Sequence, residues 1–198
     1  LDRKAKIPKV KLEDIFHPMM LAHPIEQNDF PKLKPIDYIA EWKWDGVRVQ
    51  IVIYKNILKI FSRTGEEITQ TFPEIQIKSK ELMVLDGELL VGNNFNPLSF
   101  NKLQQRLNRK KIVKKHLVEF PAFIKLYDIL IHKDKDVREK SFTERRFYLE
   151  NWHNDNPSEF FDLSEIINFS SWNELFKLKE LRLFDQEREG LMIKKKNS

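Results

Sequence analysis

The clearest pattern in this 198-residue sequence is a set of short runs in which apolar and polar side chains alternate. A period of two is typical of β-strands that bury one face. The pair Lys55-Asn56 separates two of these runs and predicts a tight turn. The runs that show the alternation most clearly are residues 38–44, 47–54 and 58–61.

Further strand patterns follow along the chain. Residues 83–85 and 88–91 are two short strand-like runs on either side of Asp86-Gly87, which we interpret as a turn. A longer apolar run predicts a strand at residues 122–131, and another predicts a strand at residues 190–194.

Four segments between the strands predict helices. Two of them begin with the Ser-x-x-Glu capping pattern, at Ser141 and at Ser171, and Ser99 is a candidate N-cap for a third. In the fourth, Pro73 is tolerated because it falls in the first turn. The predicted helices are residues 73–80, 99–109, 141–151 and 171–188.

This mixture of hairpins and interspersed helices predicts an α+β fold, with antiparallel β-sheets flanked by helices. The length and the 41% hydrophobic composition suit one domain with its own core. Residues 1–35 are rich in lysine and proline and have little periodicity. We interpret them as an N-terminal arm that wraps the domain, and residues 36–198 as the domain itself.

The composition excludes some classes of protein. Cysteine is absent, so disulfide bonds play no part, and no run approaches the roughly 18 consecutive apolar residues of a membrane span. We therefore expect no membrane partner. The 35 lysines and arginines exceed the 30 acidic residues, giving a formal net charge of +5. That excess is compatible with a polyanionic partner but too small to demonstrate one, and each basic run taken alone is interpreted as a solvated face.

Residues 41–48, with the sequence EWKWDGVR, carry the most informative chemistry. On a strand, Glu41 and Lys43 point to one face and the two tryptophans point to the other. Asp45-Gly46 has the composition of a two-residue hairpin turn, which would bring Arg48 back alongside Lys43. A lysine among fixed charges at a strand end is a candidate covalent nucleophile.

Further short segments follow this one in a definite order. Together with residues 41–48 and the stretch PMMLA at 18–22, they resemble the signature segments of the ATP-dependent DNA ligases, within the covalent nucleotidyltransferase superfamily. The resemblance covers most of the chain and implies a nucleotidyltransferase (ATP-grasp-like) adenylation domain. The segments are residues 61–69 (FSRTGEEIT), 72–74 (FPE), 85–89 (LDGEL), 126–130 (LYDIL) and 189–194 (EGLMIK).

The resemblance implies a reaction with Lys43 as the nucleophile. Lys43 would attack the α-phosphorus of ATP, release pyrophosphate and hold AMP through a P–N bond. The AMP would pass to the 5′-phosphate of a nick in double-stranded DNA, and the 3′-hydroxyl would then displace it. Mg²⁺ or Mn²⁺ would neutralise the phosphate oxygens that repel the attack. The alternative for Lys43 is a surface lysine beside an Asp-Gly turn.

The resemblance also assigns nucleotide-binding residues. It implies that Glu41 accepts a hydrogen bond from the adenine amino group, and that Arg48 contacts the ribose and phosphate. It implies that Tyr127 stacks on the purine, that Arg63 serves nucleotide or DNA phosphate, and that Lys194 faces the phosphates. The residues alone leave a salt bridge open for Glu41, a structural ion pair for Arg63 and a core position for Tyr127.

Two glutamates from distant segments, Glu88 and Glu189, are implied as the metal-side carboxylates, with Glu88 also near the ribose. Mg²⁺ prefers a few carboxylates together with water and phosphate oxygens, and one glutamate from each segment suits that preference. Asp86 is interpreted as a turn residue, and the five histidines show no spacing that predicts a zinc site. Three arginines match the family positions after the stacking aromatic: Arg138, Arg145 and Arg146.

The ends of the sequence raise a further expectation. The chain starts at Leu1 and stops at Ser198, before the family's next lysine motif and the oligonucleotide-binding-fold domain that normally follows. We therefore expect a monomeric piece of a longer ligase that is weak or inactive by itself. The parent protein would act near the nucleoid in the cytoplasm of a bacterium, or in the nucleus of a eukaryote.

Three alternatives stay open. RNA ligases and mRNA-capping guanylyltransferases share the Lys-x-Asp-Gly nucleophile, although residues 62–66 with 72–74 favour a DNA ligase and Glu41 suits adenine. The third alternative is a noncatalytic nucleic-acid-binding module that retained the fold, for which the basic charge would suffice. The presence of Lys43 and both metal-side glutamates argues against it.

Overall fold

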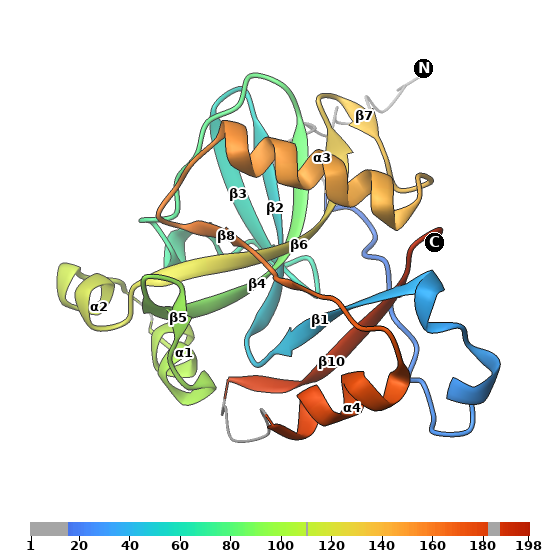
Figure 1. Ribbon diagram of the computed structural model, residues 1–198. Helices are drawn as coiled ribbons and strands as arrows, with labels where there is room; N and C mark the ends of the chain where they lie inside the picture. Colours follow the sequence, from blue (N-terminus) through green and yellow to red (C-terminus); the bar gives the residue numbers. More distant parts are fainter. Residues whose placement is uncertain (1–15, 110, 182–186) are drawn as a thin grey trace, which may run out of the picture.

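The computed structural model describes residues 16–109, 111–181 and 187–198. Two β-sheets lie side by side, with helices packed around them (Figure 1). The smaller sheet has 3 strands in the order β10-β1-β9, all antiparallel. Its strands are β1 (Tyr38–Trp44), β9 (Ile166–Ile167) and β10 (Arg188–Lys195).

The larger sheet has 7 strands, and its main path has the order β3-β2-β4-β6-β7. Strand β5 pairs with β4, and β8 pairs with β6 in the one parallel pairing among the described strands. The strands are β2 (Val47–Tyr54), β3 (Ile57–Ser62), β4 (Met83–Asn93), β5 (Asn96–Pro97), β6 (Ala122–His132), β7 (Lys135–Asp136) and β8 (Phe161–Leu163).

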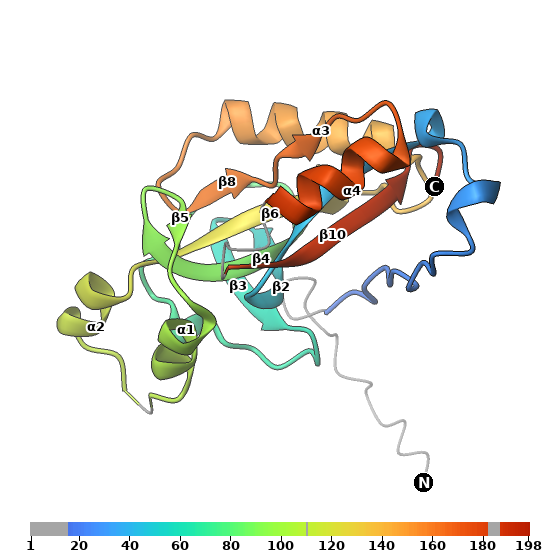
Figure 2. The ribbon, with the colours of Figure 1, turned by 60° about the horizontal axis from the view of Figure 1, so that its bottom comes forward.

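Helices cover parts of both sheets. Helix α3 lies across the larger sheet, α4 lies beside β10, and α1 and α2 project from one end of the larger sheet (Figures 1 and 2). None of the helices in the described ranges is long and apolar enough to cross a membrane. The helices are α1 (Phe100–Leu107), α2 (Lys114–Glu119), α3 (Phe142–Asp155) and α4 (Trp172–Leu181), and the 3-10 turns are η2 (Phe30–Lys32), η3 (Pro35–Asp37) and η4 (Thr69–Thr71). The predicted α+β class with antiparallel sheets is therefore confirmed.

The main core lies on one face of the larger sheet. Val49, Ile51 and Ile53 of β2 alternate into it, and Leu149 and Trp152 of α3 cover it. Period-two burial of this kind lets the opposite face of the same strands carry polar groups. That opposite face bears Arg48, Gln50 and their neighbours, and it holds much of the candidate site.

Several local predictions are confirmed. Lys55 and Asn56 form the turn between β2 and β3, with φ of 49° and 65°, the left-handed conformation that two-residue hairpin turns require. Helix α3 begins with the predicted capping box: the Ser141 hydroxyl accepts from the Glu144 N–H, and the Glu144 carboxylate accepts from the Ser141 N–H. Ser99 is the N-cap residue of α1, although its side chain makes no capping hydrogen bond.

The prediction of a turn at Asp86-Gly87 is wrong. Both residues lie inside the continuous strand β4. Gly87 is needed there because β6 approaches closely: a Cβ at this position would lie 2.7 Å from the Cγ2 of Ile124 and 2.8 Å from the carbonyl oxygen of Lys125. The glycine therefore serves packing between strands, and Asp86 is a buried side chain rather than a turn residue.

The predicted hairpin at Asp45-Gly46 is also wrong, because the strands before and after it belong to different sheets. β1 pairs with β9 and β10, whereas β2 pairs with β3 and β4. Gly46 again permits a close approach, since a Cβ there would lie 2.5 Å from the carbonyl oxygen of Leu89. Arg48 consequently starts a strand of the larger sheet and does not return alongside Lys43.

Two helix predictions differ from the structure. Residues 73–80 form turns and extended chain, because Ile75 packs in the main core while the Ser79 carbonyl accepts from the Asn56 N–H. The helix predicted at 171–188 ends at Leu181 as α4, residues 182–186 lie outside the described ranges, and Arg188 already belongs to β10.

The described part of the predicted arm, residues 16–35, contains the 3-10 turn η2, the first residue of η3 and no strand. The His17 N–H donates to the side chain of Gln50 at 2.7 Å. Phe16 and Met20 pack against a second apolar cluster, which includes Val52 and Leu130. The structure thus shows these residues lying against β2 and its neighbours. Residues 1–15 lie outside the described ranges.

Arg106 in α1 connects several segments at one end of the molecule. Its side chain is fully buried and forms an ion pair with Glu74, while its guanidinium donates to the carbonyl oxygens of Thr71 and Phe120 at 3.0 and 2.7 Å. Glu74 in turn accepts from the Ala122 N–H. One buried charge pair therefore connects α1, the segment after η4 and the start of β6.

We predict that Arg106→Ala lowers the free energy of unfolding by about 3–5 kcal/mol, because it leaves Glu74 partly buried without its partner. Urea denaturation followed by circular dichroism measures the change. Gln105→Ala, an exposed position on the same helix, serves as the control and should shift stability by less than about 0.5 kcal/mol. Equal midpoints for the two variants would contradict the assignment.

Candidate active site

Strand β1 presents two charged residues on one face. Glu41 and Lys43 alternate with Trp42 and Trp44, and the tryptophans pack with Leu90 on the opposite face. The predicted division of faces is confirmed. Lys43 lies near the end of β1 with about half of its side chain exposed (51%), and it forms an ion pair with Glu189 of β10.

A β-bulge places Glu189 beside Lys43. In the β1–β10 register Lys43 is opposite Gly190, but Trp44 is opposite Arg188, so Glu189 is an extra residue on β10. Without the bulge Glu189 would be opposite Trp44 and point to the tryptophan face. A bulge re-aims a side chain in this way and is common beside functional sites.

Glu41 is almost fully buried, with 1% exposure. Lys194 of β10 donates to one of its oxygens at 2.7 Å, and Arg146 of α3 donates to the other at 3.3 Å. Burial raises the pKa of Glu41, while Lys194 and Arg146 act in the opposite direction. Lys194 therefore contacts Glu41 and is not directed to open solvent.

Arg48 forms a two-pronged ion pair with Asp86, from strand β2 to strand β4. Its Nε lies 3.1 Å from one carboxylate oxygen and its Nη2 lies 2.5 Å from the other, and Nη2 also donates to the carbonyl oxygen of Met20. Although burial lowers the pKa of Arg48, hydrogen bonding to Asp86 raises it overall above its ordinary value. The guanidinium is thus fixed in position and permanently charged.

Glu88 differs from the other carboxylates of the site. It is directly opposite Arg48 in the β2–β4 pairing, yet it makes no ion pair with any residue in the described part of the chain. Burial, and next the neighbouring charge of Asp86, raise the pKa of Glu88 to about 8, while Arg48 and Lys43 act to lower it. This carboxyl group is therefore protonated near neutral pH and would ionise readily if a cation bound beside it.

Tyr127 sits at a second bulge. Asp86 is opposite Asp128 and Gly87 is opposite Leu126, so Tyr127 is an extra residue on β6. Because of this shift, Ile129 packs in the main core and does not share the face of Tyr127. The Tyr127 ring has the Lys194 ammonium at 5.0 Å and the Arg48 guanidinium at 5.9 Å from its centroid.

The predicted residues fall into two groups. The structure brings most of them together where β1 and β10 of the smaller sheet meet β2, β4 and β6 of the larger sheet. Arg63 is separate: it lies exposed on the turn after β3 and makes no ion pair with the residues that the structure describes. The residues brought together are Glu41, Lys43, Arg48, Glu88, Tyr127, Glu189 and Lys194.

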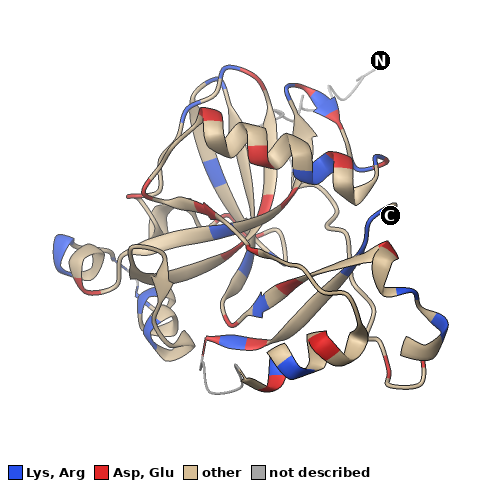
Figure 3. Cartoon of the chain, viewed as in Figure 1, with Lys and Arg blue, Asp and Glu red and all other residues tan. Residues whose placement is uncertain are grey.

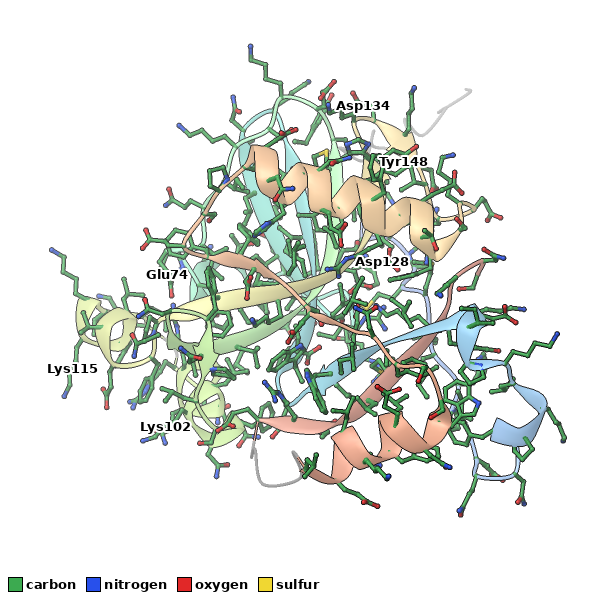
Figure 4. The ribbon with its side chains drawn as sticks, viewed as in Figure 1. Glu74, Lys102, Lys115, Asp128, Asp134 and Tyr148 are labelled. Atoms are coloured by element: carbon green, nitrogen blue, oxygen red, sulfur yellow. The ribbon has the colours of Figure 1, made fainter. Side chains whose placement is uncertain are left out.

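Sequence reasoning missed the ion pairs that hold these residues in place, although the resemblance had named Arg145 and Arg146. Asp86 was interpreted as a turn residue but anchors Arg48. Asp128 and Arg145 form a buried ion pair that joins β6 to α3, with an Nε–Oδ1 distance of 2.9 Å (Figure 4 labels Asp128). Arg146 reaches Glu41. The adjacent arginines Arg145 and Arg146 on α3 were visible in the sequence. Their acidic partners, Asp128 and Glu41, lie 17 and 105 residues away, so the sequence did not connect them.

The donor set suits a hard cation that also binds phosphate. Among the described residues there is no group of three or more acidic, histidine or cysteine side chains arranged to hold a metal ion alone. Glu88 and Glu189 both lie near Lys43, and Mg²⁺ takes one or two carboxylates together with water and substrate phosphates. The two glutamates therefore fit a metal whose remaining ligands come from a nucleotide.

Comparison with known proteins identifies the family. The family described as the ATP dependent DNA ligase domain matches residues 19–198. The chain belongs to this family. A probable DNA ligase from Koribacter versatilis is 36% identical over 141 residues, which are 69% of this chain and 24% of that protein. A DNA ligase from Methanosphaera stadtmanae is 32% identical over 162 residues, which are 79% of this chain and 28% of that protein.

Solved structures show the same fold in a ligase domain. A mycobacterial DNA ligase D complexed with ATP and MES superimposes with a TM-score of 0.69 and 21% identity, covering 93% of this chain and 56% of that chain. The chain spans about a quarter of the length of the two DNA ligases compared in the previous paragraph. The family match favours DNA ligase over the RNA ligase and capping-enzyme alternatives.

We predict a specific pH dependence of stability from Glu88 in the metal-free ligase domain. Because the pKa of Glu88 is raised from 4.5 to about 8 in the folded state, the folded state binds more protons than the unfolded state between these values. The contribution of Glu88 to the free energy of unfolding is fully present below pH 4.5. It falls as pH rises towards 8, by up to about 1.4 kcal/mol per pH unit.

Urea denaturation from pH 5 to pH 8 in EDTA tests this. The difference in unfolding free energy between Glu88→Gln and wild type should grow in favour of the variant as pH rises. Glu119→Gln, at an exposed position on α2, controls for the loss of one carboxylate. Parallel curves for wild type and Glu88→Gln would refute the raised pKa.

Proposed function

We propose that this ligase domain carries out covalent nucleotidyl transfer from ATP, with Lys43 as the nucleophile, as the first step of sealing nicks in double-stranded DNA. The observation that supports it most directly is the position of Lys43. It is half-exposed, while the charged groups around it are fixed by buried partners. A reactive side chain that is accessible on a rigid frame is the arrangement that covalent catalysis needs.

In the proposed step the Lys43 Nζ attacks the α-phosphorus of ATP. A P–N bond forms, the bond from phosphorus to the pyrophosphate oxygen breaks, and pyrophosphate leaves with that electron pair. Lys43 must lose a proton before the attack, and the Glu189 carboxylate, which is in contact with Nζ, can pass that proton to solvent before it takes up the metal ion. The same carboxylate orients Nζ before the nucleotide binds.

The remaining residues would bind and orient the nucleotide. Arg48 cannot swing away, because Asp86 holds both prongs of its guanidinium, so it would present a fixed positive charge to ribose or phosphate oxygens. Tyr127 would offer a flat ring to the purine. Glu41 already accepts from two cations, but a carboxylate has about four acceptor sites and can also accept from the adenine amino group.

Glu88 and Glu189 would hold Mg²⁺ together with the nucleotide phosphates. When bound, the metal ion would supply charge neutralisation at the phosphate oxygens, which otherwise repel the approaching lysine. Glu88 would ionise on metal binding, because a neighbouring cation lowers the pKa that burial has raised. Its proton would pass to solvent.

The later steps concern the whole protein. AMP would move from Lys43 to the 5′-phosphate of the nick, and the 3′-hydroxyl would then displace AMP to restore the phosphodiester. The similarity to proteins named DNA ligase supports nicked double-stranded DNA as the substrate. These steps are proposed for a monomeric protein in which this domain works with a following oligonucleotide-binding-fold domain.

We predict that incubation with ATP and Mg²⁺, with pyrophosphatase present, adds the mass of one AMP to the ligase domain, weakly in the domain alone and fully in a chain extended through the following lysine motif, and that Lys43→Ala abolishes this adduct. Intact-mass spectrometry measures the change. GTP in place of ATP should give little or no adduct, which separates this activity from that of a capping enzyme. Lys55→Ala, at an exposed turn lysine, should leave the adduct unchanged.

A wild-type domain that forms no adduct, while a chain extended through the following lysine motif forms one, would show that the first step needs more than this domain. No adduct from either chain, together with unimpaired DNA binding, would favour the noncatalytic alternative instead.

We predict that Glu88→Gln and Glu189→Gln each raise the Mg²⁺ concentration for half-maximal adduct formation by about 10-fold or more. The physical reason is the loss of one of two carboxylate ligands. A Mg²⁺ titration of adduct formation measures it, with Glu119→Gln as the matched control. A lower maximal rate at an unchanged Mg²⁺ midpoint would assign both glutamates to orienting Lys43 and not to the metal.

A further inference from the structure

The excess positive charge of the chain is concentrated in one segment. Residues 99–119, which contain α1 and α2, have seven basic residues and one acidic residue, a net charge of +6. The whole chain has a net charge of +5, so the remaining residues together are at −1. The whole excess of positive charge therefore lies in about a tenth of the chain.

The fold places these charges at one end of the molecule (Figure 3). Figure 3 shows the basic side of α1 and α2 at the end of the molecule where both helices project, and Figure 4 places Lys102 and Lys115 at this same end. Each of the cations below is exposed, and none forms an ion pair with a residue in the ranges that the structure describes. We call this surface the basic end: Lys102, Arg109, Lys111, Lys114 and Lys115.

The lysines at the opposite end of the larger sheet make a useful contrast. There, Lys133 and Lys135 alternate with Asp134 and Asp136 in and beside β7, so the local charges cancel (Figure 4 labels Asp134). At the basic end Glu119 is the one acidic residue of the segment. Like charges without interspersed acids create a potential that attracts a polyanion.

Buried hydrogen bonds from Arg106 hold the helices of the basic end against the body of the domain. The guanidinium of Arg106 is buried beneath it and donates to the Phe120 carbonyl, which ends α2, and to the Thr71 carbonyl in the body of the domain. The Lys102 ammonium lies 5.7 Å from the centroid of the Phe120 ring. Helices held in this way keep their charges in place, which lowers the entropic cost of binding a rigid partner.

We propose that the basic end binds the sugar-phosphate backbone of the duplex that flanks the nick. The proposal rests on the proposed function for the choice of DNA as the polyanion. Regularly spaced phosphates match a cluster of unpaired lysines and arginines, and each phosphate that is neutralised releases counterions from the duplex. The contact positions the DNA without reading its sequence.

The turn between β4 and β5 lies near α2 of the basic end, because its Phe95 lines one pocket together with Leu117 of α2. Phe95 in this turn packs on Phe123, and the Lys125 ammonium lies 5.9 Å from the Phe95 ring and 5.2 Å from the Trp44 ring. Trp44 is next to Lys43. One turn of duplex DNA is about 34 Å long, so a duplex with its nick at Lys43 would extend onto neighbouring surfaces of the domain.

The test compares the wild-type ligase domain with three variants in binding a fluorescent nicked duplex over a range of KCl concentrations. The first variant changes all five residues of the basic end to glutamine. The control variant changes five exposed lysines from the opposite end to glutamine, so both lose the same charge. The control substitutions are at Lys55, Lys78, Lys80, Lys133 and Lys135.

We expect the basic-end variant to bind the duplex at least about 10-fold more weakly than the control variant at low salt. The slope of log affinity against log salt should fall by about one for each side chain that contacts a phosphate, and so by up to about four or five. Adduct formation with ATP should be unchanged in both variants. A version with the four basic-end lysines changed to arginine keeps the charge and should bind as wild type does.

Equal affinities and slopes for the two glutamine variants, or a wild-type domain without duplex affinity, would overturn the proposal. Vesicles containing phosphatidylserine serve as a second polyanion, because Val118 is 81% exposed on α2. Loss of vesicle binding with unchanged duplex binding would identify a membrane surface and refute the DNA contact. Adduct formation is measured separately, so a failure of Lys43 chemistry is distinguished from a failure of DNA binding.

Discussion

The buried carboxylate of Glu41 is the group on which the arrangement of the site depends. It receives Lys194 from β10 and Arg146 from α3, and Lys194 also donates to the Tyr127 carbonyl in β6. One acidic side chain therefore joins both sheets and a helix. Burial of an isolated charge is costly, and these two cations offset that cost; removal of either would leave an uncompensated charge, a loss of about 3–5 kcal/mol in comparable buried pairs.

The charges paired with Glu41 are held in place, whereas the charge of Lys43 lies on a half-exposed side chain. The buried pairs Arg48–Asp86 and Arg145–Asp128 extend the same principle around the site, because each fixes a cation with a nearly inaccessible carboxylate. The exposed pair between Lys43 and Glu189 contributes little to stability and can be exchanged for a ligand. The site thus keeps its frame when the nucleophile changes its partner.

Local patterns predicted the longer strands, the Lys55-Asn56 turn, the capping box of α3 and the two faces of β1, since each depends on neighbours in the sequence; the short strands β5, β7, β8 and β9 were not predicted. They failed where the determining contact is distant. Asp-Gly pairs are typical of turns, but Gly46 and Gly87 are present because other strands approach their backbone. The buried partners Arg106 and Glu74 are 32 residues apart, and no local period connects them. The site residues were found through motif order, whereas their partners required the fold.

The bulge at Glu189 has a consequence for how this domain can vary during evolution. The one extra residue at the bulge determines which side chains of β10 point to Lys43 and which point to Trp44. This is so because side chains alternate between the two faces along the rest of the strand. A deletion of a single residue near Gly190 would exchange the faces on one side of the deletion even if every remaining side chain were kept. A single substitution in β10 leaves the faces of its other residues unchanged, whereas a change in its length does not, so the fold constrains the chain length at this point as well as the glutamate.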